Sequence, residues 1–445
     1  MLLHRCEKSW ADKNIDEKLL VYEDVTLCRL QGFTMRIAFI VNVFPLLSET
    51  FILNQITGLI DRGHEVDIHA HNTGELKKTH GDVEEYSLLK TLNIISCPKG
   101  RLAVLGCLLK VLLTNISESK KILKAIKHSE DGLMKSLQEI CQASNFMGKE
   151  YDIILCHFGP NGVFAASLTD KKLMSGKLVT VFHGYDMTTY LRGRDAGCYD
   201  RLFAAGDLFL PISDRWKKKL LSLGCPENKM VVHRMGIDVN KFVFRSREVD
   251  KDPVKLITVC RLVEKKGVEF GIRAVADCLD KYPGCRIQYR IVGNGPLFKE
   301  LEGLIAELDV QENIQLLGWK DQDEVSALMD EADIYIGPSV TSRAGDQEGI
   351  PVVLMEAMAK GLIACATYHS GIPELLEDGV TGYLVPESDV SALSDKLHYV
   401  LTNKDKWFEI SANGYEKVCK EYNIQVLNDR LESLLNKCIK GGRLQ

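Results

Sequence analysis

The chain has 445 residues, of which 45% are hydrophobic and 26% charged, a balance typical of globular proteins. Because single hydrophobic cores stop growing at about 250 to 300 residues, this length predicts two or three domains. The formal net charge of −5 argues against nucleic acid as a partner, since nucleic-acid-binding surfaces are strongly basic.

Cysteine usage and targeting signals indicate the compartment. The 14 cysteines are scattered without a Cys-x-x-Cys pair, and Cys156, Cys260 and Cys365 fall inside apolar runs. This pattern predicts free thiols in a reducing compartment, without a disulfide framework or zinc site. No run reaches the roughly 18 apolar residues of a membrane-spanning helix, and the N-terminus lacks the apolar core of a secretory signal, so we expect a cytoplasmic protein. Residues 1–34 are charged and aperiodic and are predicted to be either a disordered extension or the product of an upstream start site.

The folded part begins with a strand over residues 36–43, whose continuous apolar run is typical of a parallel strand covered on both faces. The loop that follows contains Ser48 and Glu49, either of which could start a helix that continues to Leu59. In open α/β sheets the loops after strands face the ligand crevice, so this loop is a candidate binding segment.

Between Arg101 and Cys141 the rhythm of strands gives way to helical segments. Residues 101–113 are apolar apart from Lys110, and four lysines follow closely, at Lys120, Lys121, Lys124 and Lys127. A basic, amphipathic helix pair could lie on an anionic membrane surface, which would suit a lipid-linked acceptor. A core helix followed by a solvated face explains the pattern as well, and this is the preferred interpretation.

Histidines follow directly after the next two strands, which we predict over residues 152–156 and 177–182. After the second strand the chain reads His183-Gly184-Tyr185-Asp186, where the glycine permits close approach of a ligand. We interpret His183 as a site residue rather than a structural histidine, whereas for His157 the two interpretations stay equal. The first half of the chain is completed by predicted strands over residues 207–211 and 230–234 and by a helix capped by Ser213.

Charged residues dominate residues 240–253, where apolar periodicity lapses and the domain boundary is placed. A strand over residues 254–260 then delivers Arg261 and Lys266 on a loop that ends in glycine. A guanidinium fork and an ammonium group at this spacing can reach a diphosphate from two sides. A solvated charged loop is the alternative, and we favour the diphosphate site.

Two further loops are predicted to lie beside the same ligand. Gly293-Asn294-Gly295 follows a strand over residues 286–292, but it lacks the third glycine of a dinucleotide-binding loop and is interpreted as a turn beside the nucleotide. Gly318 follows a strand over residues 314–317. The acidic pair Asp321 and Asp323 is better explained by helix capping than by a metal.

The most informative stretch of the chain is residues 347–360, which place Glu348 and Glu356 on either side of a loop-to-helix junction. Pro351 suits the first helical position, and Gly349, followed by Ile350, lets backbone N–H groups approach a ligand. The helix N-terminus attracts an anion, so the two carboxylates and the helix together suit an elongated polar ligand such as a sugar nucleotide. The alternative is one capping acid and one satisfied core glutamate.

This stretch resembles the family 4 glycosyltransferases, retaining enzymes of the GT-B fold whose signature is two glutamates separated by seven residues. The resemblance covers nearly everything after Met35. It implies an α/β protein with two doubly wound, Rossmann-like domains facing across a cleft. Residues 35–243 would bind the acceptor and residues 244–425 the nucleotide sugar, and a helix in residues 426–445 would cross back to the first domain.

The resemblance also implies roles for individual residues. Glu348 would contact the donor sugar, Glu356 the ribose, His183 the donor sugar near the reacting carbon, and Arg261 with Lys266 the diphosphate. His183, Arg261, Lys266 and Glu348 form the expected catalytic set. The expected donor-binding set is Gly184, Asp186, Asn294, Gly318, Gly349, Ile350 and Glu356. Ser48 and Glu49 resemble an acceptor-side loop, although for Ser48 a helix cap is equally good.

The function implied is a retaining glycosyltransferase that moves a sugar from a nucleoside diphosphate sugar to a glycan or lipid-linked acceptor in surface or exopolysaccharide biosynthesis. We expect no metal and no cofactor beyond the donor, and a cytoplasmic protein that could be peripheral on the inner face of the membrane. Two alternatives are a non-hydrolysing sugar-nucleotide epimerase of the same fold and a catalytically silent scaffold of a polysaccharide-assembly complex.

Overall fold

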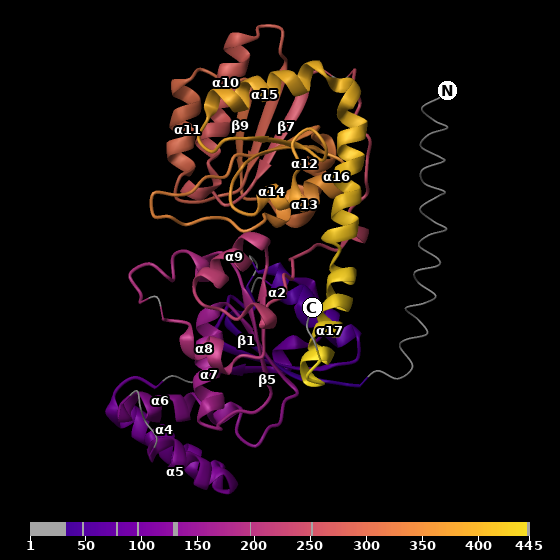
Figure 1. The fold of residues 1–445 in the computed structure, drawn as a ribbon. Helices are drawn as coiled ribbons and strands as arrows, with labels where there is room; N and C mark the ends of the chain where they lie inside the picture. The colour runs from indigo at the N-terminus through magenta and orange to yellow at the C-terminus, as the bar shows by residue number, and fades with distance from the viewer. Residues whose placement is uncertain are drawn as a thin grey trace.

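The computed structural model describes residues 33–46, 49–76, 79–95, 98–127, 132–195, 197–250 and 252–442. Two six-stranded sheets, in which every pairing is parallel, form the two halves of the chain, with helices packed around them (Figure 1). The prediction of an α/β protein with two doubly wound domains is therefore confirmed. Ser48 and most of the predicted N-terminal extension lie outside the described residues.

The first sheet has the strand order β3-β2-β1-β4-β5-β6. Its strands are β1 (Arg36–Phe44), β2 (Glu65–Thr73), β3 (Leu92–Ile94), β4 (Ile153–His157), β5 (Lys177–Phe182) and β6 (Leu208–Pro211). Its helices are α2 (Thr50–Asp61), α3 (Gly81–Glu85), α4 (Arg101–Thr114), α5 (Ser119–Lys127), α6 (Leu133–Gln142), α7 (Gly159–Asp170), α8 (Asp200–Ala205) and α9 (Asp214–Ser222). The predicted cap of α9 is confirmed, because the Ser213 hydroxyl accepts the Trp216 N–H at 3.2 Å. The strand expected over residues 230–234 is absent, since Met230 makes only an isolated bridge to Phe209.

The second sheet has the order β12-β11-β10-β7-β8-β9. Its strands are β7 (Val254–Val259), β8 (Ile287–Val292), β9 (Ile314–Gly318), β10 (Ile334–Gly337), β11 (Ile363–Thr367) and β12 (Tyr383–Val385). Its helices are α10 (Val268–Lys281), α11 (Phe298–Glu307), α12 (Gln322–Glu331), α13 (Val352–Ala359), α14 (Ile372–Leu375), α15 (Val390–Thr402) and α16 (Trp407–Glu421).

The chain crosses between the two halves twice, and the crossings lie side by side. The Ile237 N–H donates to the Tyr422 carbonyl at 2.9 Å, and the Ile424 N–H donates back to the Ile237 carbonyl at 2.8 Å. After the second crossing α17 (Ile424–Ile439) runs along the first half (Figure 1), where Leu431 and Leu435 are fully buried in its core. Two adjacent extended segments therefore form the covalent hinge of the molecule.

Helices α4 and α5 project from the first half, away from the second (Figure 1). Along α4 only Val104 and Val111 are buried, while Leu102, Leu109 and Leu113 are 86%, 60% and 65% exposed. The preferred interpretation of this segment as a core helix is therefore wrong. Within the described residues no single helix is long and apolar enough to span a membrane; α4 and residues 116–126 meet that requirement only as a pair, which is bent by 101°.

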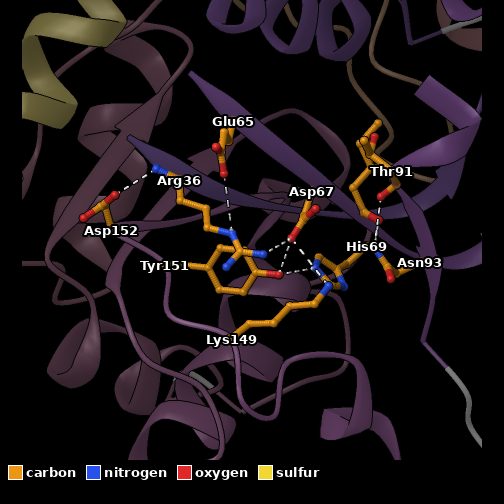
Figure 2. Close-up of polar contacts among 10 residues, drawn as sticks. Arg36, Glu65, Asp67, His69, Thr91, Asn93, Lys149, Tyr151 and Asp152 are labelled. Atoms are coloured by element: carbon orange, nitrogen blue, oxygen red, sulfur yellow. Dashed lines mark hydrogen bonds and ion pairs between the residues drawn. The ribbon is translucent and has the colours of Figure 1, made fainter. Parts of the chain in front are cut away.

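A polar cluster joins β2 to the segment that follows α6 (Figure 2). The Tyr151 hydroxyl donates to Asp67 Oδ2 at 2.8 Å, and Arg36 Nη2 lies 3.3 Å from the same oxygen. The fully buried His69 stacks on Phe146 at 4.1 Å, with its Nε2 3.1 Å from the Tyr151 hydroxyl. These contacts fix the segment that follows α6 to β1 and β2.

Candidate functional site

The loops that follow the strands of the two sheets meet at the junction between the halves, where α9 faces α13 and α14 (Figure 1). One close approach is at Gly184, after β5. A Cβ atom there would lie 3.3 Å from the Gln347 carbonyl oxygen and 3.7 Å from the Gly349 nitrogen. Glycine at this position therefore lets the loop of His183 lie against the loop of Glu348, which brings together candidates that the sequence places 165 positions apart.

Glu348 is the centre of a small ionic cluster. Its Oε2 lies 2.8 Å from Lys266 Nζ and its Oε1 lies 3.1 Å from Lys265 Nζ, which also lies 3.1 Å from Asp346. Burial raises the pKa of the Glu348 carboxyl, but the two ammonium groups outweigh it and lower this pKa to about 2. Glu348 is therefore ionised at neutral pH and holds the ammonium of Lys266 in place.

The loop that carries the lysines is packed against its neighbour. Gly267 has φ +59°, and a Cβ atom there would collide with the Pro338 carbonyl oxygen. The Val340 N–H donates to the Lys265 carbonyl at 2.9 Å. Because a left-handed backbone and close contact both exclude a side chain at residue 267, the glycine that ends this loop fixes the position of the two lysines.

Glu348 is also held through its backbone by a histidine that the sequence reasoning missed. The Glu348 N–H donates to Nε2 of His369 at 3.0 Å, and Nδ1 of the same ring lies 2.7 Å from Glu387 Oε1. His369 follows β11 closely, so the signal that identified His183, a histidine after a buried strand, was present here as well.

Arg261 lies on the same loop as Lys265 and Lys266. Its side chain is exposed, and it has no hydrogen-bond or ion-pair partner among the described residues. Backbone hydrogen bonds connect the loop of Arg261 to its neighbours. The Leu262 N–H donates to the Asn294 carbonyl at 2.9 Å, and the Gly293 N–H donates to the Gly318 carbonyl at 2.8 Å. The loops of Arg261, Asn294 and Gly318 are thus adjacent. The Asn294 side chain itself accepts from the next backbone N–H, that of Gly295.

The second carboxylate of the pair, Glu356, lies inside α13. The helix begins at Val352, one residue later than expected, with Pro351 in the capping position and Gly349 and Ile350 half-buried before it. Burial raises the pKa of the Glu356 carboxyl to about 7, against the opposing effect of Lys360. The Glu356 side chain has no hydrogen-bond partner among the described residues, so its carboxylate is available to a ligand.

On the first half, Asp186 connects two loops. Its Oδ1 accepts the His183 N–H and its Oδ2 the Gly159 N–H, both at 2.8 Å, and the side chain is fully buried. Burial raises its pKa to about 7, although these hydrogen bonds lower it. Asp186 therefore positions the His183 loop against the start of α7, and its carboxylate faces the backbone rather than the cleft.

Glu49 occupies the capping position of α2 but makes no capping hydrogen bond with its side chain. Burial raises the pKa of its carboxyl to about 7. Two residues later, the Phe51 ring packs on His183 with the ring centroids 4.9 Å apart. The predicted acceptor-side loop therefore adjoins the histidine of the site.

A clasp of polar contacts, also missed in the sequence, joins the halves. Glu374 of α14 accepts the N–H groups of Asp214 and Arg215, the first residues of α9, at 3.0 and 3.1 Å. Arg234 Nη2 lies 3.2 Å from the same carboxylate, and Arg215 Nη2 donates to Gln347 Oε1 at 2.8 Å. A carboxylate from one half thus caps a helix of the other, a favourable charge–dipole contact.

The predicted capping role of Asp321 is confirmed by its capping box with Glu324 at the start of α12. No group of three or more histidine, cysteine or acidic side chains suited to a metal ion occurs in the part of the chain that the structure describes.

Comparisons with known sequences find related proteins for both halves of the chain. A family model described as Glycosyl transferases group 1 matches residues 239–417, and one described as Glycosyltransferase Family 4 matches residues 48–241. WcaL, a putative colanic acid biosynthesis glycosyltransferase of Salmonella typhimurium, is 41% identical over 408 residues, which cover 90% of this chain and 99% of that protein. The amylovoran biosynthesis glycosyltransferase AmsK of Erwinia amylovora is 38% identical, over 91% of this chain and 100% of that protein.

Solved structures resemble the whole described molecule. A crystal structure of HepE from Anabaena in complex with UDP matches with a TM-score of 0.65 and 18% identity, covering 91% of this chain and 100% of that one. A glycosyltransferase from Rickettsia africae matches with a TM-score of 0.67 and 18% identity, covering 92% and 100%. Both therefore share its fold.

Proposed function

The chain belongs to the group 1, family 4 glycosyltransferases of the GT-B fold, and we propose that it is a retaining enzyme that uses a nucleoside diphosphate sugar to build an exopolysaccharide. The observation that carries this proposal is the cationic loop of Lys265, Lys266 and Arg261, which lies next to the N-terminus of α13 and across the junction from His183. The names of WcaL and AmsK support a role in exopolysaccharide assembly.

The cationic loop suits the leaving group of such a reaction. When the bond between the anomeric carbon and the phosphate breaks, negative charge grows on the diphosphate. A preorganised donor aimed at such charge contributes about 3 to 4 kcal/mol to transition-state stabilisation. Arg261 is free to bind, Lys266 is held in place by Glu348, and the α13 N-terminus adds a partial positive charge. The donor diphosphate is the natural ligand for this arrangement.

Glu356 suits the other end of the same donor. Its carboxylate lies within α13, beyond the helix end that faces the diphosphate, and has no partner among the described residues. A ribose carries two adjacent hydroxyls that can donate to such a carboxylate. HepE was crystallised with UDP, which makes UDP the first nucleotide to test here.

Retention by same-face attack fits this site better than a covalent intermediate. A nucleophilic carboxylate would have to be free to reach the anomeric carbon. Asp186 is fully buried with both oxygens bound to backbone N–H groups, and Glu348 is held by two ammonium groups. We therefore assign the protonation of the leaving oxygen to the acceptor hydroxyl itself, and expect the reaction to need no metal.

The acceptor side includes a candidate membrane contact. Helix α4 carries exposed leucines and the following helix α5 carries the exposed Lys120, Lys121 and Lys124, while the side chain of Lys127 lies outside the described residues. An apolar face flanked by ammonium groups is the composition that binds anionic bilayers. We propose that the enzyme works as a peripheral protein on the inner face of the membrane, where a lipid-linked acceptor would be found.

The test is a donor screen followed by product analysis. The purified protein is mixed with UDP, GDP and their hexose conjugates, and thermal stabilisation identifies the nucleotide. Release of nucleoside diphosphate from the bound donor, with an α-linked product from an α-linked donor, supports the proposal. Epimerised nucleotide sugar without release of diphosphate, or an inverted linkage, would overturn it.

A further inference from the structure

His183 is paired with a second buried imidazole that the proposed reaction does not use. Nδ1 of His157, at the end of β4, lies 3.1 Å from Nε2 of His183, and the two rings are stacked with centroids 5.3 Å apart. His157 is fully buried and also stacks on Phe39, at 5.3 Å. His183 is 5% exposed, and its Nδ1 has no partner among the described residues.

Both rings are neutral at physiological pH. Burial lowers the pKa of His183 to about 3 and that of His157 well below its usual value, with the charges of His183 and His233 acting in the same direction on His157. A single proton is therefore shared across the 3.1 Å contact, and either ring could supply it.

The two possible donors differ in whether they leave Nε2 of His157 buried with a proton or without one. Nε2 of this ring has no hydrogen-bond partner, either from His233 or from any other described residue. If His183 donated, His157 would carry its own proton on Nε2, and a buried N–H would lack an acceptor. If His157 donates from Nδ1, the unpaired atom is its Nε2, which then carries a lone pair and no proton. Orphaned buried N–H groups are rarer in proteins than under-used acceptors.

At His69, another buried histidine of this protein, the hydrogen bonds determine which ring nitrogen carries the proton (Figure 2). The Tyr151 hydroxyl donates to Asp67, so it can only accept from Nε2 of His69 at 3.1 Å. The proton of His69 is thus on Nε2, and its buried Nδ1 is left as a lone pair without a partner. This ring uses its N–H and leaves its acceptor unpaired.

We infer that His157 is a positioning residue that donates from Nδ1 to Nε2 of His183 and thereby fixes His183 in the tautomer that presents Nδ1–H to the substrate. This inference rests on the proposed function for the identity of the substrate, a donor sugar beside the diphosphate. In this tautomer His183 is a hydrogen-bond donor and not a base. The proton of the acceptor hydroxyl must then leave with the diphosphate oxygen as the new glycosidic bond forms and the old one breaks.

The tautomer is measured directly by ¹⁵N NMR on the protein labelled in its histidines. Protonated and bare ring nitrogens have well-separated ¹⁵N shifts, and spectra of the His157 and His183 variants assign the signals. We expect His183 to carry its proton on Nδ1 and His157 on Nδ1. A proton on Nε2 of His183 would overturn the inference, and this result is independent of whether any donor is turned over.

Kinetics of three variants separate positioning from packing. His157→Leu removes the donor, and we expect turnover to fall about tenfold to a hundredfold with the Kd for nucleoside diphosphate unchanged. His157→Asn keeps an N–H near the position of Nδ1, and should recover most of this loss. His69→Leu is the matched control, since it removes a buried, stacked histidine from β2, two strands away from β4 in the same sheet.

Urea unfolding of each variant shows how much stability it has lost. Equal losses of turnover in the Leu and Asn variants of His157, or an equal loss in His69→Leu, would mean that His157 acts only by packing. A wild-type protein that releases no diphosphate from any donor would refute the proposed function, while the NMR result would still decide the tautomer.

Discussion

Replacing Glu348 by glutamine tests the ionic cluster at the centre of the site. The substitution keeps the size of the side chain and removes the charge that pairs with Lys266 and Lys265 at 2.8 and 3.1 Å. The pKa of Glu348 falls from its ordinary 4.5 to about 2 in the folded protein, and the side chain is only 12% exposed. At roughly 1.4 kcal/mol per pKa unit, the folded state gains about 3 kcal/mol from the ionised carboxylate.

The sign of the pH dependence follows from the lowered pKa. A carboxyl group with a folded pKa below its unfolded value stabilises the fold above pH 4.5, and this contribution is lost as the pH falls from 4.5 toward 2. We therefore expect Glu348→Gln to lower the free energy of unfolding by about 3 kcal/mol at pH 7, and the difference from wild type to shrink below pH 4.5.

The same substitution should have opposite effects on two ligands. Without Glu348 the two lysines lack a counter-charge, so free nucleoside diphosphate should bind at least as tightly as to wild type. Use of the intact donor should fall, because the proposed contact with the sugar is gone.

Urea unfolding at several pH values and calorimetric titration of nucleoside diphosphate and donor measure these effects. Asp346→Asn is the control, since it removes only the 3.1 Å pair with Lys265 at a more exposed position and should cost at most about 1 kcal/mol. Unchanged stability of Glu348→Gln at pH 7, or equal losses of affinity for both ligands, would refute this reasoning.

Four further predictions concern the rest of the site and the projecting helices. Arg261→Ala and Lys266→Ala should each reduce turnover by about two to three orders of magnitude without loss of the circular dichroism of the fold, and near-wild-type rates in both would remove the diphosphate assignment. Glu356→Gln should weaken the binding of the donor and of free nucleoside diphosphate alike. Because burial raises the pKa of Glu356 to about 7, the affinity of the wild type for nucleoside diphosphate should rise from pH 6 to pH 8, and this rise should be smaller in the variant. Activity should survive EDTA, and its loss with rescue by magnesium or manganese would contradict metal independence. Replacing the four lysines of α5 by glutamine should release the protein from anionic vesicles, at about 1 kcal/mol per lysine, while transfer to a soluble acceptor analogue is unchanged; failure of the wild type to sediment with such vesicles at low salt would exclude the membrane contact. The lysines replaced are Lys120, Lys121, Lys124 and Lys127.

The strand framework could be predicted from the sequence because strands covered on both faces are unbroken apolar runs. The runs at residues 36–43, 177–182 and 254–260 became β1, β5 and β7 with boundaries shifted by at most one residue. Parallel strands place their following loops at one edge, so the chemistry-bearing residues after each run could be assigned to a common crevice. The two halves of the site could be proposed from local pattern for this reason.

What the apolar runs could not show is whether a partner covers them. Residues 101–113 are as apolar as a core helix, but only Val104 and Val111 are buried, since α4 packs mainly against α6. The run at residues 230–234 likewise lacks a neighbouring strand to pair with beyond one bridge. Whether an apolar segment is buried or paired depends on which other elements pack beside it in the fold, and the local sequence of the segment does not specify this.

The sequence by itself therefore determined the fold class, the family and the residue types at the end of each strand. The tertiary structure alone decided which of them meet. His157 reaches His183, His369 holds Glu348, and Glu374 caps α9 across the junction because of strand order and the packing of two domains. Such contacts join residues 21 to 160 positions apart, and their energies depend on distances of a few ångströms that only the packed fold sets.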